Sequence, residues 1–102
     1  MEHFIEVAGA TIDTRNFING ERVATGDTFA NHSPIDGTFL GDIHQAGEAE
    51  VNAAVDAARA AFPAWAAMGP AKRGELLHKL ADLVEANIET LAMIETMDNG
   101  SL

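Results

Sequence analysis

Residues 38–62 read TFLGDIHQAGEAEVNAAVDAARAAF, and the spacing of the apolar residues changes within this stretch. Up to Gly47 the period is 2, which is typical of a β-strand whose side chains point alternately to two faces. After Gly47 the larger apolar residues recur at intervals of four, three and four residues, as Val51, Val55, Ala58 and Phe62. That spacing places them on one face of a helix. The stretch predicts an α/β chain, or an α+β fold for an isolated fragment.

Turn signals before Gly47 predict two β-hairpins over residues 16–45. Asn19-Gly20 separates two short β-prone runs, and both residues accept the positive φ angles of a type I′ turn. In Pro34-Ile35-Asp36-Gly37, the proline presets φ and the glycine closes a type I turn, so the strand from Thr28 to Ser33 should return from Thr38 to His44. Residues 1–15 show no sustained period and are expected to form an extended, partly mobile lead-in.

The remaining residues, 46–102, have the pattern of three helices. Pro63 should end or kink the first helix near Phe62, and Gly69-Pro70 should start the second. Asn87 separates the second helix from a third, which should run to about Met97 and stop at Asp98-Asn99-Gly100.

Composition excludes several classes of function. The chain has 102 residues, of which 47% are apolar, and a formal net charge of -10. The six basic residues are scattered, so a phosphate backbone would be repelled and no nucleic-acid partner is expected. The sequence has no run near the roughly 20 apolar residues that span a bilayer, and its first residues lack a basic signal region. We therefore expect a cytoplasmic protein with no membrane partner.

The residue types that carry chemistry do not form a recognisable active site. The sequence contains no cysteine, and Ser33 and Ser101 lie in turn-like contexts without a nucleophile elbow. The histidines do not have the spacing of a helical zinc site, and His78 is expected at the boundary of a leucine face. No glycine-rich phosphate loop is present. The sequence thus predicts no catalytic residue and no cofactor-binding residue.

Five motifs resemble, in their order and spacing, the start of the aldehyde dehydrogenase superfamily. Members of that family typically begin with an F-I-N-G-E-W hairpin, an N-P-x-x-G turn, an acidic helix ending in A-A-R-x-A-F and an E-x-x-D-x-G-K-P stop. The corresponding motifs here are Asn16-Phe-Ile-Asn-Gly-Glu21, Asn31-His-Ser-Pro-Ile-Asp-Gly37, the helix from Ala46 to Phe62, Trp65, and Glu95-Thr-Met-Asp-Asn-Gly100.

Three positions depart from the family pattern. Arg22 stands where tryptophan is common, and Ser33 stands where asparagine usually precedes the proline. Both are surface-level changes of little consequence for family membership. Ser101-Leu102 replaces the usual Lys-Pro, which leaves open a substitution or an altered end.

The resemblance implies the N-terminal part of an NAD(P)-dependent enzyme that oxidises an aldehyde or semialdehyde to the carboxylic acid. Residues 46–102 would be the helical part of an incomplete NAD(P)-binding domain. The parent protein would use NAD or NADP and form a homo-oligomer, and its small-molecule substrate would be an aldehyde. The isolated chain is expected to bind no cofactor and to be inactive, because the nucleophilic cysteine and dinucleotide site would lie in the remainder of the aldehyde dehydrogenase chain.

The resemblance also implies a monovalent cation site. It would consist of the Asp98 carboxylate and the backbone carbonyls of Asn31 and His32, and such oxygen ligands suit a hard cation. The alternative is that Asp98 is only a capping or surface residue at the end of a helix. For the chain as a whole, the alternative function is a non-catalytic folding or interaction module that docks through exposed strand edges or helix faces.

Overall fold

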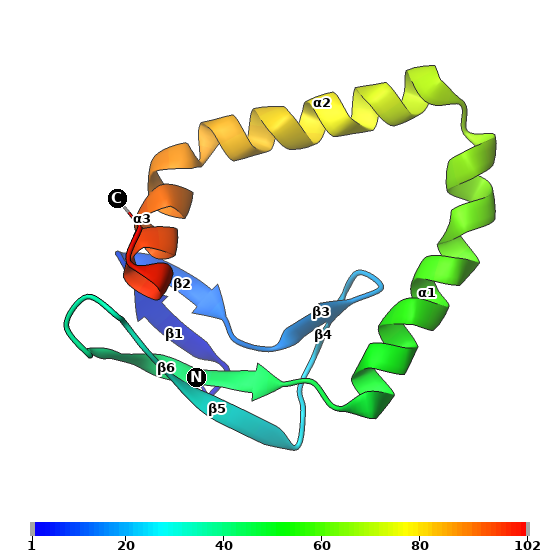
Figure 1. Ribbon diagram of the computed structural model, residues 1–102. Helices are drawn as coiled ribbons and strands as arrows, with labels where there is room; N and C mark the ends of the chain where they lie inside the picture. The colour runs from blue at the N-terminus through cyan, green and yellow to red at the C-terminus, as the bar shows by residue number, and fades with distance from the viewer. Residues whose placement is uncertain (1, 102) are drawn as a thin grey trace.

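Three β-hairpins precede three helices in the computed structural model, which describes residues 2–101 (Figure 1). This order confirms the predicted fold class. Residues 1 and 102, at the outer ends of the predicted lead-in (1–15) and helical part (46–102), lie outside the described residues. The elements are β1 (Phe4–Val7), β2 (Ala10–Asp13), β3 (Asn16–Ile18), β4 (Glu21–Val23), β5 (Asp27–His32), β6 (Phe39–Gln45), α1 (Glu48–Ala67), α2 (Pro70–Ala86) and α3 (Ile88–Asn99).

The structure contains both hairpins that turn signals indicated between residues 16 and 45. In β3–β4, Ile18 pairs with Glu21, and the two turn residues have positive φ angles of 52° at Asn19 and 79° at Gly20. This is the geometry of a type I′ turn. In β5–β6, Gly37 at φ 78° donates its N–H to the Ser33 carbonyl at 2.8 Å and closes the turn.

A third hairpin corrects the expectation of an extended lead-in over residues 1–15. Strands β1 and β2 pair antiparallel, with Val7 opposite Ala10. The turn residues Ala8 and Gly9 have φ angles of 51° and 78°. Sequence reasoning missed this turn because alanine rarely adopts positive φ, so Ala-Gly lacks the signal that Asn-Gly carries.

Helix α1 does not end near Phe62 but continues through Pro63 to Ala67. Proline removes one intrahelical hydrogen bond, and the neighbouring alanines, which have the highest helix propensity, carry the helix past that loss. The helix ends where Arg73 of α2 donates Nη1 to the carbonyls of Trp65 and Ala66 at 3.3 and 3.1 Å. The predicted start of the second helix is confirmed, with Pro70 in its first turn.

Asn87 and Gly100 act as the predicted breaks in the helical half. The Asn87 side chain donates Nδ2 to the Leu83 carbonyl at 2.8 Å, which caps the end of α2. Gly100 has a φ of 79° and donates its N–H to the Thr96 carbonyl at 2.8 Å, which ends α3 in a left-handed cap. Both breaks follow from local chemistry.

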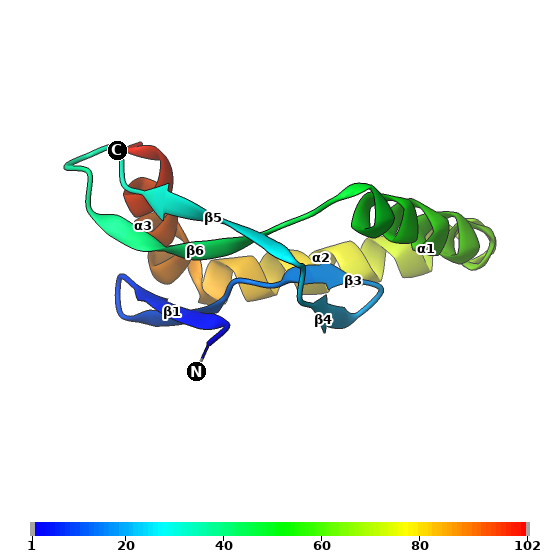
Figure 2. The ribbon, with the colours of Figure 1, turned by 90° about the horizontal axis from the view of Figure 1, so that it is seen from below.

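The helices have apolar faces that the part of the chain described here does not cover. None of the three helices contains a buried residue, and Phe62 and Leu83 are 66% and 63% exposed. The radius of gyration is 16.5 Å, whereas a compact domain of this length has about 13 Å. Figures 1 and 2 show why: α1 leads away from the hairpins, α2 runs back without lying against them, and α3 lies beside the first hairpin.

We predict that Ala8→Asn stabilises the first hairpin by up to about 1 kcal/mol, because asparagine tolerates the left-handed conformation that alanine resists. The matched opposite change is Asn19→Ala, which should destabilise β3–β4 by a similar amount. Urea titrations followed through the backbone NMR shifts of each hairpin measure both effects. An unchanged or lower midpoint for Ala8→Asn would contradict the assignment of strain to this turn.

Candidate functional site

The structure brings Asp98 and Asn31, two members of the predicted cation site, into contact. Asn31, near the end of β5, donates Nδ2 to Asp98 Oδ1 at the end of α3 over 2.7 Å, although the residues are 67 positions apart. The His32 ring packs against Phe39 with the ring centroids 5.4 Å apart. The side chain of His32 is therefore occupied by packing, and its predicted role concerns only its backbone carbonyl.

An apolar hollow of about 260 Å³ lies beside this pair. Its walls come from the first hairpin, β6 and α3, and Asn31, Glu95 and Asp98 are its polar lining residues. The apolar lining residues are Ile5, Val7, Ile12, Leu40, Ile43, Leu91 and Ile94. The hollow shows that α3 and the hairpins approach each other without filling the space between them.

Asp98 contributes a carboxylate, which is the kind of oxygen ligand that a hard cation prefers. Within residues 2–101, no cluster of three or more histidine, cysteine, aspartate or glutamate side chains is placed to hold a metal ion. A cation at Asp98 would consequently need backbone carbonyls as its other ligands. The contact from Asn31 Nδ2 brings one carboxylate oxygen of Asp98 next to β5, the strand that contains Asn31 and His32.

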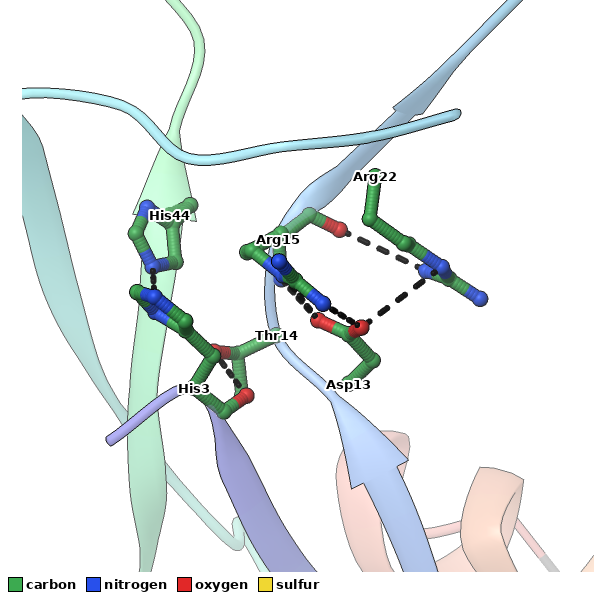
Figure 3. Close-up of polar contacts among 6 residues, drawn as sticks. All are labelled: His3, Asp13, Thr14, Arg15, Arg22 and His44. Atoms are coloured by element: carbon green, nitrogen blue, oxygen red, sulfur yellow. Dashed lines mark hydrogen bonds and ion pairs between the residues drawn. The ribbon is translucent and has the colours of Figure 1, made fainter. Parts of the chain in front are cut away.

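A second polar cluster, which we call the hairpin junction, consists of His3, Thr14, Asn16, Thr25 and His44 (Figure 3 shows three of them). Thr14 is 5% exposed and donates both its N–H and its hydroxyl to the His3 carbonyl, at 2.8 and 2.7 Å. His44 donates its N–H to the Thr14 carbonyl at 3.0 Å and accepts from Asn16 Nδ2 on its own carbonyl at 3.2 Å. The junction thereby connects all three hairpins.

Asp13 and Arg15 form an ion pair next to the junction (Figure 3). Arg15 donates Nε and Nη2 to the two carboxylate oxygens of Asp13 at 3.0 and 2.7 Å, and Arg22 Nε lies 3.8 Å from Oδ2. The side-chain hydrogen bond from Arg15 holds the pKa of Asp13 well below its usual range, and the same bond raises the pKa of Arg15. This pair fixes the link between β2 and β3.

Sequence reasoning missed the hairpin junction and the Asp13–Arg15 pair. The spacing test for histidines compares positions on a single helix, whereas His3 precedes β1 and meets His44 of β6, 41 residues away. Asp13 and Arg15 are two residues apart, but their contact depends on the turn between β2 and β3. His78 is exposed on α2, as are the leucines of that helix.

The structure places both candidate serines in turn roles. Ser33 is 1% exposed and accepts the Ile35 N–H on its hydroxyl oxygen at 3.3 Å, which is a turn role. Ser101 donates its backbone N–H to Asn99 Oδ1 at 2.7 Å. Over residues 2–101, no helix is both long and apolar enough to cross a membrane. Both serines therefore help to shape the backbone around them.

Comparisons with known proteins agree on one family. The family described as "Aldehyde dehydrogenase family" matches residues 22–102. The chain is 41% identical to 5-carboxymethyl-2-hydroxymuconate semialdehyde dehydrogenase of Escherichia coli, covering 83% of this chain and 18% of that protein. It is 45% identical to an aldehyde dehydrogenase of Paracoccus denitrificans, covering 83% of this chain and 17% of that protein.

A solved structure agrees with the sequence relatives. The structure of a putative aldehyde dehydrogenase from Burkholderia cenocepacia matches with a TM-score of 0.78 and 46% identity, over 82% of this chain and 18% of that one. The chain thus spans less than a fifth of the length of these relatives.

We predict that Arg15→Gln raises the pKa of Asp13 toward the ordinary value of about 3.9. Arg22→Gln should act in the same direction but less, because Arg22 is 3.8 Å from the carboxylate and only adds a Coulombic attraction. A depressed folded-state pKa gives stability that is present above the unfolded value and is lost as pH falls through the folded value. Carbon NMR titration of the Asp13 carboxyl measures the pKa, and a larger effect from Arg22→Gln would contradict the assignment.

Proposed function

Because this chain belongs to the aldehyde dehydrogenase family, we propose that it is the N-terminal part of a longer enzyme. That enzyme oxidises an aldehyde or semialdehyde to the carboxylic acid with NAD or NADP. The observation that carries the proposal is the agreement of fold and sequence over most of this chain with under a fifth of a much longer solved chain. The role of residues 1–102 in that enzyme is structural.

The residue types in this chain support a structural role here and catalysis in the rest of the enzyme. The sequence contains no cysteine to attack an aldehyde and no glycine-rich loop to hold a dinucleotide phosphate. The residues present therefore do not fit NAD or NADP by themselves, and both the nucleophile and the dinucleotide site belong to the remainder of the chain.

The exposed apolar residues of the helices support the remainder of the same chain as the partner. Scattered exposed apolar side chains are ordinary, but these recur at helical spacing along all three helices. They include Val51, Val55, Phe62, Leu76, Leu80, Leu83 and Leu91. Covering them completes the core of the cofactor domain, and the complete enzyme then assembles as a homo-oligomer.

The cation site is a second part of the proposal. Asp98 supplies a carboxylate oxygen, and the backbone carbonyls of Asn31 and His32 supply the other ligands that this chain contributes. The 2.7 Å contact between Asn31 and Asp98 supports it, because it holds the end of α3 against the end of β5. A cation there would neutralise charge in a chain with a net charge of -10.

The proposed activity predicts a clear difference between the 102-residue chain and the product of the complete gene. The chain alone should give no reduction of NAD or NADP with any aldehyde, and the complete protein should reduce the cofactor with an aldehyde or semialdehyde. Absorbance of the reduced cofactor measures both. A complete gene product without a cysteine-bearing region and without turnover would contradict the proposal and would favour the interaction module.

For the cation site, we predict that Asp98→Ala in the complete protein removes most of the thermal stabilisation that potassium or sodium chloride gives over choline chloride. Binding to the folded state stabilises by mass action, so losing the ligand set removes that increment. Glu89→Ala is the matched control, because Glu89 is exposed at the other end of the same helix. Equal increments in Asp98→Ala and the unchanged protein would rule out the site, while leaving the proposed dehydrogenase activity untouched.

A further inference from the structure

The rings of His3 and His44 meet at a polar hollow of about 480 Å³ beside the hairpin junction. His3 Nδ1 and His44 Nε2 are 3.2 Å apart, and the ring centroids are 5.2 Å apart with a tilt of 58° (Figure 3). His3 precedes β1, and His44 belongs to β6. Their contact is therefore a side-chain link between the first and third hairpins.

A backbone donor fixes the position of the proton on His44. The Thr25 N–H, which can only donate, points at His44 Nδ1 over 2.8 Å. The Thr25 hydroxyl also lies 3.1 Å from this nitrogen, but it donates its hydrogen to the Asp27 carbonyl at 2.5 Å. His44 Nδ1 is thus an acceptor, and in a neutral ring the proton must then be on Nε2.

The same reasoning assigns the proton on His3. Because His44 Nε2 carries a hydrogen, it donates to His3 Nδ1, which must be an acceptor with its own proton on Nε2. A directed relay results, from the Thr25 N–H to His44 and from His44 to His3. The relay requires both rings to be neutral. It also argues against a metal ion between the rings, because His44 Nε2 has no lone pair to offer in this tautomer.

We propose that His3 and His44 form a pH-sensitive latch, closed while both rings are neutral and opened when either ring takes up a proton. A proton added to His3 Nδ1 would face the N–H of His44 Nε2, so two donors would meet at 3.2 Å. A proton added to His44 Nδ1 would face the Thr25 N–H at 2.8 Å. Protonation of His3 Nδ1 removes the acceptor of the His44 Nε2–H, and protonation of His44 Nδ1 removes the acceptor of the Thr25 N–H.

Charged groups flank the latch on two sides. Glu2 and Asp42 line the same hollow as the two rings. On the side of β2 and β3, Arg15 and Asp13 are paired with each other, and Arg22 approaches the same carboxylate. That cluster has two arginines and one aspartate, so its formal charge is +1.

Opening the latch leaves the strands paired. The His3 and His44 backbones stay linked through Thr14, whose hydrogen bonds involve only main-chain groups of the histidines. Ile5 also packs against Gly41 so closely that a Cβ there would lie 2.5 Å from Ile5 Cγ2. What the latch controls is the segment around Thr25 and the attachment of the His3 ring. The inference does not depend on the proposed dehydrogenase function.

The test measures the proton positions and the Thr25 amide in the full 102-residue chain and in the complete protein. At about pH 7.5, nitrogen NMR should find His44 protonated on Nε2 with Nδ1 bare, and the exchange protection of Thr25 should fall roughly tenfold by about pH 5. The reference amide is Gly37, whose partner is the Ser33 carbonyl. Protonated Nδ1 at the higher pH, or equal protection of Thr25 at both pH values, would overturn the proposal.

Three variants complete the test. His44→Gln should give low Thr25 protection at both pH values, and His78→Gln, an exposed histidine of α2, should respond to acid as the unchanged chain does. His3→Asn keeps an acceptor oxygen but cannot take up a proton, so it should show a smaller response to acid. His3→Asn carries the test if His44→Gln fails to fold. The latch is contradicted if the Thr25 protection of His44→Gln falls in acid as much as that of the unchanged chain. If His44→Gln does not fold, the same result in His3→Asn contradicts it.

Discussion

The β half of the structure depends on the hydrogen bonds that meet at Thr14 and His44. A two-stranded hairpin is marginally stable in water, and each of the three sheets here has only two strands. Thr14 ties the start of β1 to the end of β2 and accepts the His44 N–H from β6. Asn16 of β3 adds a hydrogen bond from its side-chain amide to the His44 carbonyl. Because these groups are partly buried, removing any one would leave a donor or acceptor without water or partner.

The helical half is held by a different kind of interaction, at its ends rather than along its faces. Arg73 joins α2 to the end of α1, Asn87 joins α2 to α3, and the contact from Asn31 to Asp98 returns α3 to β5. A Cβ at Gly100 would lie 3.3 Å from the Pro34 ring, so the end of α3 also lies close to the β5–β6 turn. The apolar faces between these ends contribute little burial, which is the physical reason that the chain is so open.

Local chemistry determined how much of this could be predicted from sequence. Asn19-Gly20 and Gly100 have conformations that their own side chains, or lack of them, favour, so the turn and the stop were predictable. Ala8 adopts a conformation that alanine resists, so the hairpin that contains it could not be predicted. The relation of Asp98 to Asn31 came from the family pattern, since no spacing rule joins residues 67 positions apart. The contact between His3 and His44 depends on how the hairpins are arranged in space. The spacing of residues along the sequence does not report that arrangement.

The two halves also differ in what keeps them ordered, and this affects how the chain would unfold. The hairpins rely on long-range hydrogen bonds, which are lost together when the junction opens. The helices rely on propensity and capping: α1 has 20 residues, many of them alanine, with Glu48 and Glu50 at the positive end of its dipole. Isolated helices shorter than about 12–15 residues are marginal in water. With 12 residues, α3 lies at this limit, whereas α2 has 17. With so few side chains buried between the halves, nothing couples their order strongly until a further surface packs onto the helices.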